Sequence, residues 1–123
     1  MMKFEDFDLI EDLYWSNEED LNKADFGIVK LDDHGRVIGY NHAQEEISGV
    51  TKSFTLNKNF FRQIAPCTRI FQVAGQFATN DVLDETFDFT FTQKMRPTMV
   101  RLRLLKDQWG SYLLVKRLQQ AAA

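Results

Sequence analysis

The only cysteine of this 123-residue chain lies in the segment Asn59-Phe60-Phe61-Arg62-Gln63-Ile64-Ala65-Pro66-Cys67-Thr68. Two aromatic residues and a short apolar run precede the cysteine, and they predict a short helix over residues 58–64. Pro66 holds its own φ at about −65°, has no N–H to donate and favours an extended conformation at Ala65. We therefore expect Cys67 on a constrained turn just past the end of this helix. A thiol in such a place is either a small buried hydrophobic group or a nucleophile and attachment point.

The residues before this segment predict a β-hairpin. Residues 26–31 and 36–40 have the composition of strands, and the turn between them is Asp32-Asp33-His34-Gly35. Gly35 is placed where such a turn needs a positive φ. His34 should be solvated at this turn, and no second metal ligand stands at a suitable spacing from it.

A block of short helices should follow the hairpin. Asn41 is a natural N-cap, and Gln44 takes the third helical position after it. Further on, apolar residues at helical spacing predict a longer helix over residues 71–83 that covers the sheet. The apolar residues of this pattern are Phe71, Ala74, Phe77, Ala78 and Val82.

The last third of the chain predicts three antiparallel strands, over residues 86–93, 98–106 and 109–118. Strict alternation in the first of them places Phe87, Phe89 and Phe91 on one face. The second strand should point Val100, Leu102 and Leu104 inward, and Asp107 and Gln108 should form the turn that follows it. A hairpin, a block of helices and a run of strands together imply an α+β fold.

The first 24 residues combine acidic groups with an apolar stripe, formed by Phe4, Phe7, Ile10, Leu13 and Tyr14. This spacing favours two small helices lying over an apolar surface rather than a disordered acidic arm. Ser16 and Glu19 have the spacing of a capping box that begins the second helix.

The totals of the sequence exclude several classes of protein. A length of 123 residues fits one domain, and the net charge of −3 argues against a nucleic-acid groove. A single cysteine forms no internal disulfide, so we expect a reducing, cytoplasmic location. No apolar run is long enough for a membrane span, and the acidic start does not resemble a signal peptide.

Several segments resemble the photoactive yellow protein family of blue-light receptors. Asn-Phe-Phe followed four residues later by Ala-Pro-Cys-Thr, at residues 59–68, resembles the segment that carries the family's chromophore. Residues 26–32 and 40–49 resemble its first strands and the segment after them. Residues 87–91 and 95–98 resemble its third strand and the next loop. The resemblance runs from about Asp25 to the end, whereas the first 24 residues match weakly.

The resemblance implies a PAS domain with a five-stranded antiparallel sheet, short helices on one face and an N-terminal helical cap. We expect residues 1–24 to form the cap and residues 25–123 the photosensor core. It further implies a 4-hydroxycinnamoyl (p-coumaroyl) group joined as a thioester to Cys67, in a pocket between the helices and the phenylalanine face. Signalling would follow from trans–cis photoisomerisation and partial unfolding, with the cap as the reporter.

A buried phenolate needs hydrogen-bond donors, because burial alone favours the neutral phenol. Tyr40 offers an O–H, Gln44 offers an N–H, and Ser48 can donate to Tyr40 and orient it. Their spacing of four and eight residues places them along one side of a short helix and its exit. The remaining site residues implied by the resemblance are Phe60 and Phe91 against the ring, Val29 and Ile64 in the apolar lining, and Val50 and Met95 beside the chromophore.

This chain departs from the family pattern at four places. Gln44 stands where the family usually has a glutamic acid, so the side chain can donate a hydrogen bond but has no proton to transfer at neutral pH. Val50 replaces an arginine that covers the ring, Gln93 replaces a tyrosine, and Arg96 beside the retained Met95 is unusual. The departures affect the proton-transfer step more than chromophore binding.

Two other functions are compatible with the sequence. The first is a chromophore-free PAS module that binds a small ligand or a partner through the same face. The second, a thiol enzyme, is disfavoured because neither histidine has an apparent partner carboxylate and both lie in or near turns. A signalling protein is the expected partner, of unknown identity, and the chain should be a monomer or weak dimer.

Overall fold

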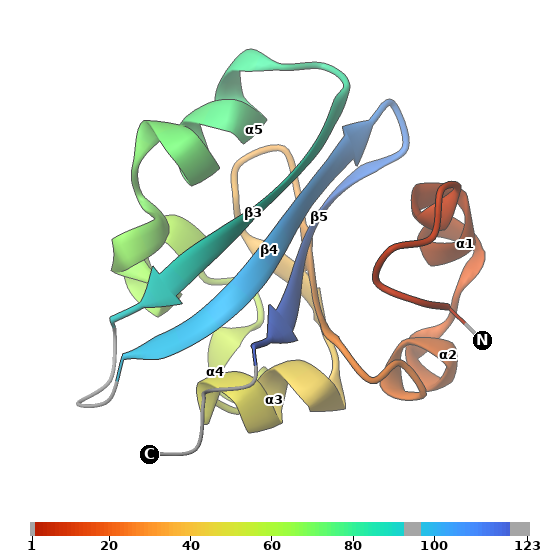
Figure 1. The fold of residues 1–123 in the computed structure, drawn as a ribbon, viewed down its shortest axis with the longest axis horizontal. Coiled ribbons are helices and arrows are strands. Elements are labelled where there is room, and N and C mark those ends of the chain that lie inside the picture. The colour runs from red at the N-terminus through yellow and green to blue at the C-terminus, as the bar shows by residue number, and fades with distance from the viewer. Residues whose placement is uncertain (1, 93–96, 119–123) are drawn as a thin grey trace.

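The computed structural model describes residues 2–92 and 97–118. A five-stranded sheet lies between the N-terminal helices and the helical middle of the chain (Figure 1). In chain order the elements are α1 (Leu9–Trp15), α2 (Glu18–Asn22), β1 (Gly27–Leu31), β2 (Val37–Tyr40), α3 (His42–Ser48), α4 (Lys52–Thr55), η1 (Phe60–Ile64), η2 (Pro66–Thr68), η3 (Phe71–Gly75), α5 (Gln76–Thr79), β3 (Leu83–Phe91), β4 (Thr98–Asp107) and β5 (Gly110–Arg117). The predicted α+β order and the five antiparallel strands are confirmed.

The first two strands form the predicted hairpin. Val29 pairs with Tyr40, and the register shifts by one residue near the turn, between Lys30 and Leu31. Gly35 has a φ of 80°, which is the left-handed conformation that the turn requires. Asp32 stabilises the turn because its carboxylate accepts hydrogen bonds from the backbone N–H groups of His34 and Arg36, both at 2.9 Å.

The other three strands form an antiparallel meander, and β5 joins it to β1 in the order β2-β1-β5-β4-β3. The sequence placed the closing strand one residue too early, since Trp109 lies in the turn before β5. The strand β3 is also longer than predicted at its start and begins at Leu83. The predicted inward residues of β4 are fully buried: Val100, Leu102 and Leu104.

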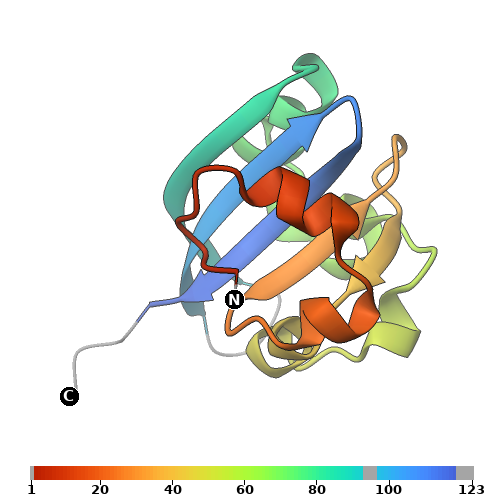
Figure 2. The same ribbon diagram turned by 90° about the vertical axis from the view of Figure 1, so that its right-hand side faces the viewer.

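Each face of the sheet carries its own apolar core. Alternation along β4 places Leu102 and Leu104 in the core under the helical middle and Leu105 in the core under α1. Figure 2 shows α1 lying across the sheet on the side opposite the helical middle. The apolar residues that the N-terminal segment buries there are Phe4, Leu9, Leu13 and Ala24.

The N-terminal segment is helical as predicted, but three details of the prediction were wrong. Tyr14, which the apolar stripe included, is exposed rather than buried. Phe7 lies in a turn before α1 and is 92% exposed, while Leu9, the first helical residue, takes the buried position. The capping box of α2 uses Asn17 and Asp20 instead of Ser16 and Glu19. The hydroxyl of Ser16 instead donates to the carbonyl of Asp12 at 2.6 Å, so it closes the end of α1.

Arg103 anchors the segment before α1 to the sheet. Its buried guanidinium donates to the carbonyls of Phe4 and Asp6, each at 2.8 Å. The other side of the guanidinium binds both carboxylate oxygens of Asp84 at 3.0 Å. A buried cation therefore makes four hydrogen bonds at the place where the N-terminal segment crosses the sheet.

The helix expected over residues 71–83 is shorter and less regular than the sequence predicted. It consists of the π-helical turn η3 and the single α-helical turn α5, and the chain becomes extended at Asn80. Phe77 is buried as predicted, but Phe71 and Ala78 are exposed, and Val73 is buried in the wider π turn instead. Val82 is exposed because it lies beyond the helix. Throughout the described residues, no helix has the length and apolar character needed to cross a lipid bilayer.

Candidate functional site

Cys67 lies on the constrained turn that the sequence predicted. Asn59 caps the preceding helix η1 by accepting a hydrogen bond from the backbone N–H of Arg62 at 3.0 Å. Ala65 is the residue between η1 and the 3₁₀ turn η2, which contains Pro66 and Cys67. The hydroxyl of Thr68 donates to the carbonyl of Ala65 at 2.6 Å and closes the turn. Cys67 is partly buried and packs against the core under the helical middle.

The apolar residues expected around a ligand lie in one core. Val29 comes from β1, Phe60 and Ile64 from η1, and Phe91 from β3, and all four are buried. The phenylalanine face of β3 contributes to the same core, with the ring centroids of Phe89 and Phe91 5.6 Å apart. Residues far apart in the sequence therefore form the aromatic and aliphatic core against which Cys67 packs.

A pair of hydroxyl groups forms a polar position in this core. The oxygens of Tyr40 and Ser48 are 2.6 Å apart, and either group can be the donor. Ser48 also accepts a hydrogen bond from the backbone N–H of Val50 at 3.1 Å. Burial raises the pKa of Tyr40 above its ordinary value, and the hydrogen bonds of Ser48 and Gln44 oppose this rise. Tyr40 is therefore a neutral phenol that can donate its proton in a hydrogen bond.

Gln44 is buried beside this pair, with 2% of its surface exposed. Its carbonyl oxygen Oε1 has no hydrogen-bond partner among the described residues. Gln44 is close enough to Tyr40 to lower the pKa of the phenol against the effect of burial, and its amide N–H is a group that can donate at this position. The polar position thus combines one amide donor with two hydroxyl groups.

Asn41 has a larger role than the N-cap that the sequence predicted. Its side-chain oxygen accepts from the backbone N–H groups of Gln44 at 3.1 Å and Ile28 at 2.8 Å. Its amide donates to the carbonyls of Leu21 at 2.9 Å and Phe26 at 3.0 Å. This one buried side chain therefore joins α3 to β1 and to the end of α2. The sequence signalled the cap but gave no sign of the long-range partners.

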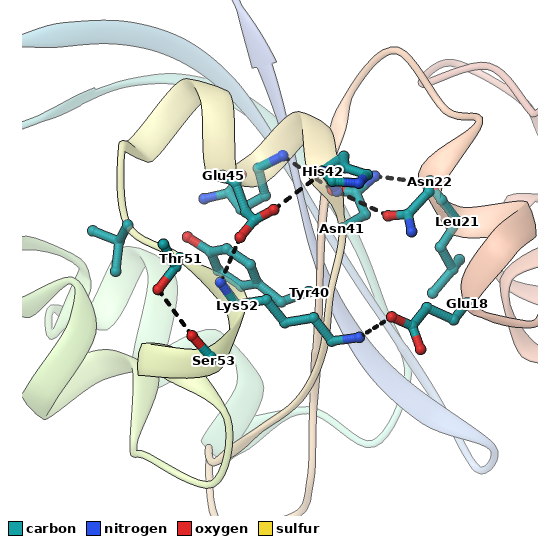
Figure 3. Close-up of polar contacts among 12 residues, drawn as sticks. Glu18, Leu21, Asn22, Tyr40, Asn41, His42, Glu45, Thr51, Lys52 and Ser53 are labelled. Atoms are coloured by element: carbon teal, nitrogen blue, oxygen red, sulfur yellow. Dashed lines mark hydrogen bonds and ion pairs between the residues drawn. The ribbon is translucent and has the colours of Figure 1, made fainter.

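The outer side of α3 makes a second set of contacts with α2 and α4, which Figure 3 shows. The carboxylate of Glu45 lies 3.2 Å from Nδ1 of His42 and accepts from the backbone N–H of Lys52 at 2.8 Å. Lys52 forms an ion pair with Glu18 of α2. His42 thus has a carboxylate partner, which corrects the sequence prediction that neither histidine has one. The carboxylate of Glu45 is engaged by His42 and Lys52, and its negative charge contributes to the raised pKa of Tyr40.

The structure leaves some of the expected site residues untested. Val50 is partly buried, and its backbone contacts Ser48. Met95 lies outside the described residues, as do Gln93 and Arg96.

The described site residues are consistent with a small aromatic acid attached through sulfur. They supply the hydroxyl groups of Tyr40 and Ser48, the amide of Gln44 and the partly buried thiol of Cys67. The unpartnered atom of Gln44 is its carbonyl oxygen, which needs a donor and which a phenolate cannot satisfy, so the fit depends on the hydroxyl pair and on the packing of Cys67 against the core.

The sequence matches the PAS fold family over residues 18–115. It is 36% identical over 109 residues to the photoactive yellow protein of Halochromatium salexigens, and the match covers 83% of this chain and 86% of that protein. The photoactive yellow protein of Rhodothalassium salexigens is 30% identical over 122 residues, which cover 95% of this chain and 98% of the relative.

Solved structures of related domains have the same fold. The photoactive yellow protein domain of the sensor histidine kinase Ppr from Rhodospirillum centenum superposes with a TM-score of 0.77 at 27% identity, covering 83% of this chain and 94% of that domain. The PAS domain of an HTR-like protein from Haloarcula marismortui superposes with a TM-score of 0.63 at 16% identity. The match covers 79% of this chain and 89% of that domain. The second likeness concerns the fold alone.

Proposed function

Since this chain belongs to the photoactive yellow protein family of photoreceptors, we propose that it carries a 4-hydroxycinnamoyl group as a thioester on Cys67 and senses blue light. The observation that supports the proposal most is the position of Cys67, which packs against the core that holds Tyr40, Phe60 and Phe91. A reducing cytoplasm, which we also propose, is compatible with a reactive thiol. Membership of this family identifies a photoreceptor and not an enzyme.

The residues of the core would hold the group as an anion. When bound, it supplies absorption of visible light and a double bond that isomerises from trans to cis. A phenol of this kind has a pKa of about 10, like that of tyrosine, and burial would raise it. The O–H of Tyr40 and the N–H of Gln44 can both donate to a phenolate oxygen, and Ser48 can then donate to Tyr40. These donors favour the charged form.

Gln44 changes the proton chemistry relative to an acid at this position. Its amide donates a hydrogen bond but keeps its protons at neutral pH. Protonation after isomerisation would therefore draw on water, and Val50 in place of a covering arginine gives water easier access. No new carboxylate would appear beneath α3, because Glu45 already faces His42 and Lys52 on the outer side.

The helix α3 is the element through which the site would act on the N-terminal cap, residues 1–24. Gln44 donates through its backbone to Asn41, and Asn41 donates to the carbonyl of Leu21 in α2. The backbone N–H of His42 donates to the side chain of Asn22 at 2.9 Å. A movement of α3 would weaken these contacts together, so the cap would separate from the core, residues 25–123. Deletion of the cap should leave a coloured core with much slower dark recovery.

Reconstitution with an activated ester of 4-hydroxycinnamate tests the proposal. The purified chain should gain a visible absorption band that bleaches under blue light and recovers in the dark. Cys67→Ala should fold and stay colourless, because acyl transfer needs the thiolate as its nucleophile. A reconstituted wild-type chain without any visible band would contradict the proposal and favour a chromophore-free PAS module that binds a ligand or a partner.

A further inference from the structure

The two tryptophans of the chain lie on the surface on either side of Tyr14. The ring centroid of Tyr14 is 5.0 Å from that of Trp15 and 5.3 Å from that of Trp109. Trp15 is 76% exposed, Trp109 58% and Tyr14 38%. Tryptophan and tyrosine are enriched in protein interfaces and supply much of their binding energy. Three exposed rings in contact therefore indicate an interaction surface.

This aromatic surface spans the boundary between the cap and the core. Tyr14 and Trp15 belong to the last turn of α1, which lies across the sheet in Figure 2. Trp109 belongs to the turn between β4 and β5. The backbone N–H of Trp109 donates to the carboxylate of Asp107 at 2.7 Å, which fixes the turn. A partner that contacts all three rings must bind both parts of the molecule at once.

The charge around these rings is negative. The first 24 residues hold eight acidic and two basic residues, a net charge of −6 within a chain of net −3. Trp15 lines a hollow of about 600 Å³ together with Asp12, Asp20 and Lys23. Glu11 lies one turn of α1 before Trp15, and α1 has no basic residue in its last turn. The surface therefore combines aromatic faces with an excess of carboxylates.

We propose that Tyr14, Trp15 and Trp109, with Asp12 and Asp20, bind an arginine- or lysine-bearing segment of a partner protein. Cationic side chains are attracted to the faces of tryptophan and tyrosine. The carboxylates bind the same cations, and arginine can engage a carboxylate through two parallel hydrogen bonds. Negative charge around the rings disfavours nucleic acid and anionic lipid as occupants.

Cap release would divide this surface, because Tyr14 and Trp15 would leave Trp109. Binding of the cationic segment would then be stronger in the dark than in the light. Only this light dependence rests on the proposed function, since the contact between the rings is a property of the folded chain.

Intrinsic fluorescence tests the surface directly, because both tryptophans belong to it. The probe is a short peptide of alternating arginine and glycine, added to the full chain in the dark. The control is the same peptide with glutamate in place of each arginine. We expect the arginine peptide alone to change the tryptophan emission. Trp15→Ala and Trp109→Ala should each weaken binding roughly tenfold, the loss typical of an interface hot spot. Phe71→Ala removes an exposed ring of η3 and should leave affinity unchanged.

Three results would overturn the proposed binding surface. They are equal binding of the two peptides, unchanged affinity in both tryptophan variants, and an emission change with phosphatidylcholine vesicles as large as that with the arginine peptide. A chain that associates with itself through these rings, seen by sedimentation, would overturn it as well. Illumination of the coloured protein should weaken peptide binding severalfold. Unchanged binding during a normal photocycle would contradict the light dependence, whereas a colourless protein that binds the peptide contradicts only the proposed function.

Discussion

The side chain of Gln44 lies directly against the backbone of Gly27, so that a Cβ carbon at Gly27 would stand 2.1 Å from Oε1 of Gln44. The same carbon would stand 3.3 Å from the Cα of Gln44, so the helix α3 has little room to adjust. The absence of a side chain at Gly27 therefore determines where the amide of Gln44 can be. This contact connects the first strand of the sheet to the polar position beside Tyr40.

Gly27→Ala should move the amide of Gln44 away from its present position. If that amide donates to a bound phenolate, losing the donor leaves more charge in the conjugated system. The reconstituted protein should then absorb at longer wavelength than wild type. Gly39→Ala is the matched control, because the three atoms nearest to its Cβ would all belong to Lys30 of the neighbouring strand, the first at 3.0 Å. An unchanged spectrum in Gly27→Ala would show that Gln44 does not contact the chromophore.

Gln44→Glu should have the opposite effect on colour. A carboxylic O–H is a stronger donor than an amide N–H, so it withdraws more charge from the phenolate and shifts absorption to shorter wavelength. Infrared difference spectra of this variant should show a carboxyl group losing its proton during the photocycle. Wild type should lack that band. A carboxyl signal in wild type would mean that another acid, with Glu45 the first candidate, transfers the proton.

The attachment of the cap to the core should depend on the hydrogen bonds of Asn41 far more than on the ion pair between Lys52 and Glu18. Asn41→Ala leaves buried N–H and C=O groups without their partners and should lower the free energy of unfolding by about 3 kcal/mol. Lys52→Ala breaks an ion pair that is largely exposed at Glu18, and such pairs contribute little. Urea unfolding and hydrogen exchange at Leu21 and Asn22 measure the contrast. Equal effects of the two substitutions would contradict this ranking.

Tyr112 should make the protein less stable at high pH. Its ring is fully buried beneath the cap, its Oη has no partner among the described residues, and burial raises its pKa to about 12. Below pH about 10 both the native and the unfolded chain keep the phenolic proton, so stability does not depend on it. Between about pH 10 and 12 the unfolded chain alone loses the proton, so the free energy of unfolding falls as pH rises.

Tyr112→Phe tests both consequences. Removing an unpartnered buried hydroxyl should raise the free energy of unfolding at neutral pH by about 1 kcal/mol. The fall in stability above pH 10 should become shallower without disappearing, because burial also raises the pKa of Tyr40. A less stable variant at neutral pH would show that the hydroxyl has a partner in solution, such as a bound water.

Much of the fold could be predicted because its local signals agree with one another. The turn at Gly35, the cap at Asn41 and the alternating phenylalanines of β3 each specify one conformation. The prediction failed at Phe7 and Phe71, where spacing alone could not locate the start of α1 or the π turn of η3. Helical spacing does not determine the position of a side chain that lies in a turn before the helix: Phe7 is exposed there, whereas Phe4 is buried.

The site was only partly accessible to sequence reasoning, because its decisive contacts are long-range. The four hydrogen bonds of Asn41 join backbone groups up to 20 residues away. The steric limit that Gly27 sets on Gln44 depends on how α3 packs against β1. Neither follows from residue spacing, because both arise only when the helix and the strand meet.

The central claim is that Cys67 carries the chromophore, and peptide mapping by mass spectrometry tests it most directly. The chain is reconstituted with activated 4-hydroxycinnamate, digested under acidic conditions that preserve thioesters, and fragmented to locate the modified residue. We predict that the peptide containing Cys67 gains the mass of one hydroxycinnamoyl group and that Cys67→Ala gains none. A coloured protein whose added mass lies on another residue, or a wild-type Cys67 peptide that stays unmodified, would contradict the account.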